Sequence, residues 1–264
     1  RDLRMSRGLG DVYKRQYLHR VTHNGKTKFH LIHTWGWDHP ALFHWESDDL
    51  IHWTAANGGT RTDDGKIMLM DGHDGGPVSP NAWAPEFTYD GQTGTFYLYW
   101  SSRIGDRQVH HYCTTKDWLT FSTPAVYFDP GFTAIDMTIL KEGDTYYAYY
   151  KDERNGEKTI RCATSKSLDP RVQRFEGSTP LLPSRYIEVE GPEVFPAIGG
   201  KGWFLYFDKF NGDRGVSYTG CTDPSQHKWY PIPDDEIRNP TEVKHGSVEI
   251  ISTAELEKLL EHFK

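Results

Sequence analysis

The 264-residue sequence contains few cysteines, no long apolar run and no excess of basic residues. Three cysteines, Cys113, Cys162 and Cys221, are widely spaced, which fits neither a disulfide framework nor a metal site, so we interpret them as buried thiols. No apolar run approaches the ~18 residues needed to span a membrane, and no signal peptide is visible. The net charge of −7 gives no reason to expect nucleic acid as a partner. We therefore expect neither a nucleic-acid partner nor a membrane partner.

Residues 1–16, RDLRMSRGLGDVYKRQ, differ in composition from the rest of the chain. They lack apolar periodicity and end abruptly where the strand-like YLHRVTH begins. The string GLGDVYKRQ resembles translated adapter sequence from the end of a metagenomic gene fragment, so we exclude this segment from reasoning about the fold. The expectation is a non-native segment over residues 1–16, a lost native N-terminus and a single domain over residues 17–264.

Aromatic residues, in contrast, are abundant, at 14% of the chain with nine Trp and fifteen Tyr. Four aromatic segments recur along the chain: KFHLIH from Lys28, TFYLYW from Thr95, TYYAYY from Thr145 and GWFLYF from Gly202. Each is followed by a Ser/Thr-containing tail that ends in an aromatic residue: Trp53, Phe121, Phe175 or Trp229. Such a repeat, with several short strands and turn signals per unit, is typical of a four-stranded propeller blade. The aromatic side chains fit both a filled β core and a sugar-binding cleft.

After Trp229 only residues 245–251 form a convincing strand pattern. Propellers usually close their ring by completing the last blade with strands from the other terminus, because an open edge exposes unpaired backbone groups. We therefore predict an all-β fold, a five-bladed β-propeller with an incomplete fifth blade, of low solubility or dimeric through that edge. A short C-terminal helix is also expected, because Ser252 and Glu255 form a capping box ahead of an apolar stripe that includes Leu256 and Leu260.

Acidic residues stand at a recurring offset from the aromatic segments. Glu86, Asp136 and Glu193 each lie eleven residues before an aromatic residue of the following segment, and Glu190 lies fourteen before. Because each blade offers its innermost strand to the central channel, we expect these side chains to converge. Glycoside hydrolysis needs a protonated carboxyl group for the leaving oxygen and an ionised one to activate water. For any one of these residues alone, a structural role paired with amides or arginine is the competing interpretation.

Five strings carry a resemblance to glycoside hydrolase family 43: Gly36-Trp-Asp-His-Pro40, Asn81-Ala-Trp-Ala-Pro-Glu86, Ala134-Ile-Asp-Met137, Glu190-Gly-Pro192 and Lys244-His-Gly-Ser-Val248. In this order they span most of residues 17–264. The resemblance implies a five-bladed propeller with its active site at the mouth of the axial channel. It also implies inverting hydrolysis of terminal sugars in plant-type oligo- or polysaccharides. The first expected sugar is α-L-arabinofuranosyl, and β-xylosyl and galactofuranosyl residues are alternatives.

The resemblance implies that Glu190 is the general acid and that Asp136 is the third acidic residue, which raises the pKa of Glu190 and orients it. The repeat offset alone would favour Glu193, which we instead interpret as a structural counterpart of Glu86. Family members carry the general base in an Arg-Asp-Pro motif, and Arg15 occupies the place of the aspartate here. Loss of such a base typically costs about 10²- to 10⁴-fold in rate. A carbohydrate-binding propeller without turnover is therefore the alternative function. A protein-interaction propeller of the WD type is a weaker third reading, because its repeat signatures do not recur.

Aromatic and polar residues near these motifs are the predicted substrate-binding residues. Trp83 is the candidate for stacking on a sugar face, with core packing as the alternative. Trp37 and Asp38 are expected to reach sugar hydroxyls from a loop, with a surface turn as the alternative. The remaining candidates are Glu86, His245, Trp100, Phe132, Tyr17 and Trp35. His245 resembles the family's axial histidine, which holds a water or cation. We expect no metal ligands and no organic cofactor, and the resemblance alone allows a central calcium ion.

Overall fold

The computed structural model describes residues 16–61, 63–182, 188–210, 215–237 and 245–264. Within these residues the chain folds into four antiparallel sheets of four strands each. The first two sheets consist of β1 (Gln16–His23), β2 (Lys26–Thr34), β3 (Ala41–Ser47) and β4 (Lys66–Met68), and of β5 (Trp83–Asp90), β6 (Thr95–Ile104), β7 (Arg107–Thr115) and β8 (Ala125–Phe128). The other two consist of β9 (Ala134–Glu142), β10 (Thr145–Asp152), β11 (Ile160–Ser165) and β12 (Glu176–Pro180), and of β13 (Val189–Pro196), β14 (Trp203–Lys209), β15 (Gly215–Cys221) and β16 (Tyr230–Pro231). We call these sheets blades 1 to 4.

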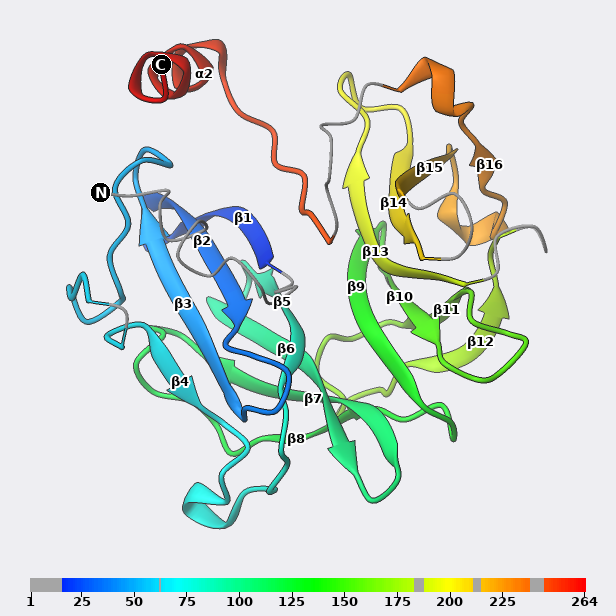
Figure 1. Ribbon diagram of the computed structural model, residues 1–264, viewed down its shortest axis with the longest axis horizontal. Coiled ribbons are helices and arrows are strands. Elements are labelled where there is room, and N and C mark those ends of the chain that lie inside the picture. The colour runs from blue at the N-terminus through cyan, green and yellow to red at the C-terminus, as the bar shows by residue number, and fades with distance from the viewer. Residues whose placement is uncertain (1–15, 62, 183–187, 211–214, 238–244) are drawn as a thin grey trace.

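The blades stand around a common axis, with β1, β5, β9 and β13 nearest to it (Figure 1). These inner strands contact one another in order, β1 with β5, β5 with β9 and β9 with β13. The predicted aromatic segments form the second strand of each blade, which confirms the repeat. Their side chains fill three cores that lie between successive blades. The tail aromatics Phe121, Phe175 and Trp229 pack against these cores, and Trp53 packs in a fourth cluster within blade 1.

The prediction of a fifth blade is not confirmed, because the described residues form four blades. The strand predicted over residues 245–251 is also wrong, since this segment has no ladder partner among the described residues. It runs along β1 through side-chain bonds instead. The Leu18 amide donates to Ser247 Oγ over 2.9 Å, and the Arg20 amide donates to Glu249 Oε2 over 2.8 Å. Two backbone groups of β1 are thereby satisfied by side chains rather than by a neighbouring strand.

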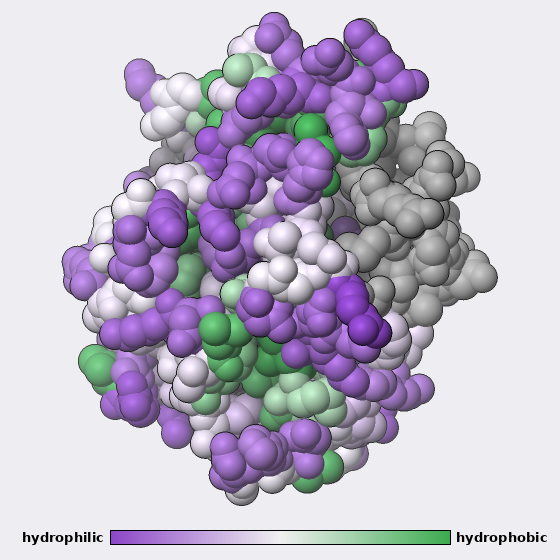
Figure 2. Space-filling view, turned by 90° about the vertical axis from the view of Figure 1, so that its left-hand side faces the viewer, coloured by the Kyte–Doolittle hydropathy of each residue, from purple (hydrophilic) through white to green (hydrophobic). Residues whose placement is uncertain are grey.

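The C-terminal helix α2 (Thr253–His262) begins at Ser252 with the predicted capping box. Arg20 holds it to β1, because its Nη2 lies 2.8 Å from Glu255 Oε2. The predicted apolar stripe is not buried, since Leu256 and Leu260 are 45% and 57% exposed. Figure 2 views the molecule from the left-hand side of Figure 1 and shows a mainly hydrophilic face with a hydrophobic patch in its lower middle. No helix in the described part of the chain is long and apolar enough to cross a membrane. All three cysteines are buried and free, as predicted.

Candidate active site

A pocket of about 190 Å³ lies where the inner strands begin. Its lining consists of Thr34, Gly36, Trp37, Trp83, Ala84, Ile135, Asp136, Glu153, Glu190 and His245. These residues come from all four blades and from the segment that precedes α2. The pocket therefore brings together both predicted catalytic carboxylates, two of the predicted tryptophans and the predicted axial histidine.

Three inner strands are bulged beside this pocket. The ladder shifts between Trp83 and Glu86 in β5, between Ile135 and Thr138 in β9, and between Glu190 and Glu193 in β13. The residues after Trp83, Ile135 and Glu190 all have left-handed backbones: Ala84 (φ 47°), Asp136 (φ 56°) and Gly191 (φ 58°). A bulge bends the strand and turns side chains away from the regular alternation, which here directs them toward the pocket.

Asp136 is 5% exposed and faces the Glu190 motif. Its Oδ2 accepts a hydrogen bond from the Gly191 amide over 3.1 Å, and its own amide donates to Ser101 Oγ over 3.3 Å. Gly191 is required by space as well as by its φ, because a Cβ there would collide with the His245 ring. Asp136 thus orients the backbone that carries Glu190.

Glu190 lies between the Lys151 ammonium and the His245 imidazole. Lys151 Nζ is 2.8 Å from its Oε2, and His245 Nε2 is 3.3 Å from its Oε1. Burial raises the pKa of Glu190, but the bond to His245 and the charge of Lys151 outweigh burial and lower it to about 2. The expectation that neighbouring carboxylates raise this pKa is therefore wrong, because the groups in direct contact with Glu190 are the Lys151 ammonium and the His245 imidazole. In this state Glu190 is ionised at neutral pH.

Lys151 and Glu153 were missed by the sequence reasoning. Lys151 is only 2% exposed, and its Nζ also lies 2.6 Å from Glu153 Oε1. Burial lowers the pKa of this amine, but Glu190, Glu153 and Asp136 raise it further, so the lysine stays charged. The available signal was a charged Lys-Asp-Glu string directly after the buried aromatic segment TYYAYY.

His245 is fixed by blade 4 at the edge of the pocket. Its amide donates to Asp208 Oδ2 over 2.9 Å, and its Nε2 lies 3.6 Å from the same oxygen. Burial raises the pKa of the Asp208 carboxyl. Asp208 is the register partner of Glu190, so the histidine connects two neighbouring carboxyl groups.

Trp37 and Trp83 form an aromatic corner of the pocket. Their rings are 5.5 Å apart and nearly perpendicular, and Trp83 Nε1 donates to the Trp37 carbonyl over 2.6 Å. Trp37 is 52% exposed. An exposed aromatic face beside carboxylates suits a sugar ring, which presents both apolar C–H faces and hydroxyls.

Four other predicted binding residues do not line this pocket. Trp100 is wholly buried in the core between blades 1 and 2, where its Nε1 donates to Ser102 Oγ, so the binding role predicted for it is wrong. Glu86 is also wholly buried and accepts a hydrogen bond from the Tyr99 hydroxyl at 3.5 Å, which favours the structural interpretation. The Phe132 ring lies under the Arg154 guanidinium at 3.9 Å, and Asp38 is exposed in its loop.

The position expected to hold the general base, Arg15, lies outside the described residues. The register of β1 with β2 begins with Gln16 opposite His33. Thr34, the next residue of β2, lines the pocket. Gln16, the first residue of β1, therefore lies opposite the residue that directly precedes Thr34 of the pocket wall.

The described residues do not provide an oxygen-rich site for the calcium ion that the resemblance allowed. Calcium takes six to eight oxygen ligands, whereas the pocket carboxylates already contact Lys151, His245 and a backbone amide. In the described part of the chain, the group with metal-ligand spacing is His30, His44 and Glu46 in blade 1. There the two imidazoles hydrogen-bond to each other at 3.0 Å, and Lys28 pairs with Glu46 at 2.6 Å. Lys28 thus already neutralises the only carboxylate of that group.

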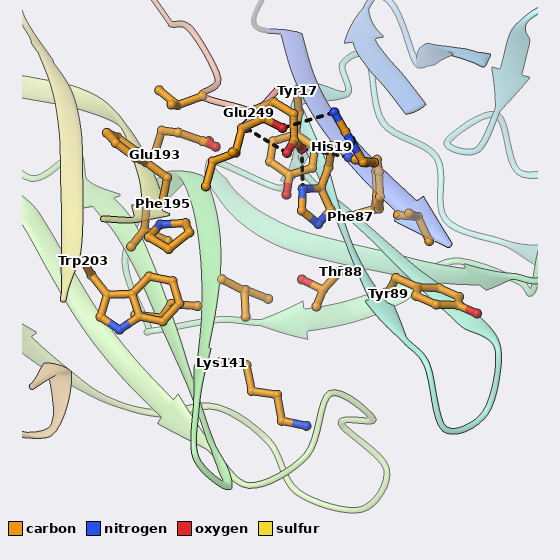
Figure 3. Close-up of a pocket in the computed structure, with 18 of the residues that line it drawn as sticks. Tyr17, His19, Phe87, Thr88, Tyr89, Lys141, Glu193, Phe195, Trp203 and Glu249 are labelled. Atoms are coloured by element: carbon orange, nitrogen blue, oxygen red, sulfur yellow. Dashed lines mark hydrogen bonds and ion pairs between the residues drawn. The ribbon is translucent and has the colours of Figure 1, made fainter. Parts of the chain in front are cut away.

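A second pocket, of about 400 Å³, lies along the later part of the inner strands (Figure 3). Tyr17, Phe87 and Trp203 contribute aromatic walls. His19 Nδ1 and Glu249 Oε2 are hydrogen-bonded there at 2.9 Å. Tyr17, predicted as a wall residue of the sugar site, therefore lines this second pocket. Trp35, the remaining candidate, is 36% exposed and packs on Phe43 in blade 1.

Comparison with known proteins gives the family. A family model described as a probable glycosyl hydrolase domain, related to glycoside hydrolase family 43, matches residues 23–257. An α-L-arabinofuranosidase of Bifidobacterium longum subsp. longum is 28% identical over 185 residues, which are 57% of this chain but only 16% of that protein.

Solved propellers share the fold at low sequence identity. GH43B of the Bacteroides ovatus xyloglucan PUL superposes with a TM-score of 0.58 at 18% identity, covering 85% of this chain and 41% of that one. The catalytic domain of a Coprinopsis cinerea GH62 α-L-arabinofuranosidase superposes with a TM-score of 0.57 at 16% identity, covering 81% and 66%. With a β-propeller fold and a family model that matches most of its length, the chain belongs to the probable glycosyl hydrolase domain family related to glycoside hydrolase family 43.

Proposed function

We propose that this chain is a glycoside hydrolase domain that acts on terminal α-L-arabinofuranosyl residues of plant-type oligo- or polysaccharides. The observation that carries the proposal is the position of Asp136 and Glu190 on the wall of one pocket, beside the exposed aromatic corner of Trp37 and Trp83. Two similar proteins are named α-L-arabinofuranosidases, which supports this sugar over β-xylosyl or galactofuranosyl residues.

In the proposed reaction Glu190, once protonated, donates its proton to the glycosidic oxygen as that bond breaks. A water molecule attacks the anomeric carbon from the opposite face, and a carboxylate base takes up the proton of that water. Inverting enzymes hold these two carboxyl groups roughly 6.5–9.5 Å apart to admit the water. Arg15 stands where the family carries the base, so we propose that this chain turns over slowly.

The second candidate is a carbohydrate-binding propeller without turnover. Two observations favour it: Arg15 is no base, and Lys151 and His245 hold Glu190 ionised in the described state. Such a protein would bind arabinose through Trp37 and Trp83 and release no product. Both candidates share the same pocket and differ only in chemistry.

The test restores the family motif with the double substitution Arg15→Asp and Gln16→Pro. Hydrolysis of nitrophenyl α-L-arabinofuranoside and of nitrophenyl β-xyloside is then followed, with arabinose affinity measured by calorimetry. We expect the restored chain to release nitrophenol about 10²- to 10⁴-fold faster than the original chain. The same restored chain carrying Glu190→Gln is the matched control: it should still bind arabinose, and its rate should fall most for an alkyl arabinofuranoside, whose poor leaving group needs the acid, and less for the nitrophenyl substrate. A restored chain that binds arabinose and yields no nitrophenol would establish the binding protein instead.

A further inference from the structure

The Lys151 side chain is a buried ammonium group shared between two carboxylates. It extends from the end of β10, is 3% exposed, and lies 2.6 Å from Glu153 Oε1 and 2.8 Å from Glu190 Oε2. The Phe210 ring covers the amine at 4.2 Å. Both carboxylates line the sugar pocket and are about one-fifth exposed, at 23% and 22%. The lysine is thus inaccessible, whereas both of its partners reach the pocket.

The pocket holds more acidic than basic groups. Among the described residues, the charged and titratable groups that face Glu190 are Asp136 from β9, Lys151 and Glu153 from β10 and the turn after it, Asp208 from β14, and His245 from the segment before α2. Four carboxyl groups thus surround one ammonium and one imidazole. Such a group can accept a further proton, and the ion pairs decide which carboxyl receives it.

A buried ammonium that lost its partner would be costly, because an unpaired charge in the interior is poorly solvated. Lys151 avoids this cost if it leaves Glu190, because the shorter contact with Glu153 remains. A lysine stem with several rotatable bonds can make this small movement. Glu153 thus lowers the free-energy cost of separating Lys151 from Glu190.

We propose that Lys151 is the positioning residue of Glu190: it keeps this carboxylate ionised and oriented in the empty pocket, and sugar binding transfers the ammonium to Glu153. Glu190 then takes a proton from water and becomes able to donate it to the glycosidic oxygen. This inference rests on the proposed function of Glu190 as the acid. It assigns to Lys151 and Glu153 the role of controlling when Glu190 becomes protonated.

The first experiment measures the charge of Glu190 directly and needs no turnover. Carbon-detected NMR of side-chain carboxyls follows Glu190, assigned by the signal lost in Glu190→Gln. In the unaltered chain we expect Glu190 to remain ionised down to about pH 4, below which acid unfolding interferes. In Lys151→Met we expect its midpoint to rise by about 1–3 pH units, the usual effect of an opposite charge at this distance, so that protonation of Glu190 becomes detectable above pH 4. Lys151→Gln repeats the measurement if the methionine variant does not fold.

Lys158→Met is the matched control, because Lys158 lies over the same Phe210 ring at 5.7 Å and contacts no carboxylate among the described residues. It should leave the Glu190 titration unchanged. Glu153→Gln should also leave Glu190 ionised, since Lys151 then has one partner only. Equal Glu190 titrations in Lys151→Met and Lys158→Met would overturn the proposal.

The second experiment places the same substitutions in the base-restored chain and measures kcat/KM against pH. Because the pKa of Glu190, about 2, lies below the ~3.9 of an ordinary aspartate base, the acidic limb of the profile reports Glu190 in the free enzyme, and Lys151→Met should move that limb upward. Glu153→Gln should lower kcat about 10- to 100-fold for poor leaving groups and much less for good ones, with KM nearly unchanged. A uniform loss for both leaving groups would refute the role of Glu153. An inactive restored chain would instead refute the proposed function, while the NMR result still decides the role of Lys151.

Discussion

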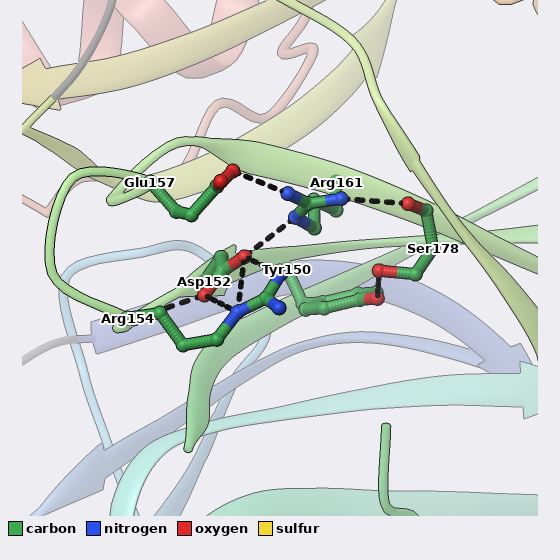
Figure 4. Close-up of polar contacts among 6 residues, drawn as sticks. All are labelled: Tyr150, Asp152, Arg154, Glu157, Arg161 and Ser178. Atoms are coloured by element: carbon green, nitrogen blue, oxygen red, sulfur yellow. Dashed lines mark hydrogen bonds and ion pairs between the residues drawn. The ribbon is translucent and has the colours of Figure 1, made fainter. Parts of the chain in front are cut away.

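Asp152 is wholly buried at the end of β10 and joins two arginines into one network (Figure 4). Its Oδ2 lies 2.6 Å from Arg161 Nε and 2.7 Å from Arg154 Nη2. The Arg161 side chain is 10% exposed and also donates to the Ser178 carbonyl and to Glu157. The Arg154 side chain is 45% exposed. Asp152→Asn therefore keeps the shape of the side chain and removes the buried negative charge that both arginines of this network contact.

The expected loss in the free energy of unfolding is the sum of two contributions, one from each arginine. Removing one partner of a buried ion pair costs about 3–5 kcal/mol, and Arg161 keeps Glu157 and Ser178, so we expect the low end of that range. Arg154 is exposed and adds at most about 1 kcal/mol. A total near 3 kcal/mol would lower Tm by about 6–12 °C, at about 2–4 °C per kcal/mol for a chain of this size.

Chemical denaturation at neutral pH measures this loss, and Asp169→Asn is the matched control. Asp169 binds Arg171 two residues later in the same bidentate way, but the Arg171 side chain is 79% exposed, so the change should stay below about 1 kcal/mol. Burial raises the pKa of Asp152, yet Arg154 and Arg161 lower it further, so its stabilisation is present above about pH 4 and lost as pH falls below that. Equal losses in the two variants at neutral pH would refute this reasoning.

Three further predictions concern single groups. Burial and the charge of Lys28 lower the pKa of His30 to about 3. The unfolded chain therefore binds this proton at higher pH than the folded chain, and the free energy of unfolding should fall from about pH 6.5 downward by up to about 1.4 kcal/mol per pH unit. A His30→Gln variant whose free energy of unfolding has the same slope against pH would contradict this. Ser252→Ala should speed amide exchange in α2 about fivefold through the loss of about 1 kcal/mol of capping, and unchanged exchange would count against the cap. Burial raises the pKa of all three thiols, so a disulfide reagent should label none before unfolding and three afterwards; rapid labelling of the native chain would disprove their burial.

The blade repeat was predictable from the sequence because it depends on strand alternation and turn residues, which are local properties. Ser47 and Thr115 show why the tails recur, since each hydroxyl accepts hydrogen bonds from the amides two and three residues later. The Asn24-Gly25 turn likewise has the positive φ values, 50° and 74°, that a tight hairpin requires. The way in which residues 247–249 contact β1 was not predictable in this way, because side chains rather than a strand satisfy the amides of Leu18 and Arg20.

The eleven-residue offset of the carboxylates from the aromatic segments identified the inner strands that carry the pocket. The residues that it selects do not, however, all occupy equivalent positions in their blades. Glu86 and Glu193 are true counterparts, since each pairs across its blade with a tyrosine, Tyr99 or Tyr206. Asp136 is not their counterpart, because it follows Ile135, which occupies the place of Glu190 in its own blade. The bulges are alike in the three blades, but the stretch of chain from the bulge through the turn to the second strand is two residues shorter in blade 3, which shifts the count and cannot be read from the spacing of aromatic residues. Lys151 was missed for another reason: its importance depends on Glu190, which is distant in sequence.

The bulge position itself argues that the Asp136 side chain has a role. The same position holds Ala84 in β5 and Gly191 in β13, and all three residues have left-handed backbones. Glycine adopts this conformation freely, whereas a residue with a Cβ pays up to about 1–2 kcal/mol. In β9 part of this cost is offset by the bond from the Gly191 amide to the Asp136 carboxylate. Strain that persists at the wall of a pocket is expected where the side chain acts there, so Asp136→Gly should leave the fold intact while freeing the Glu190 loop and weakening sugar binding.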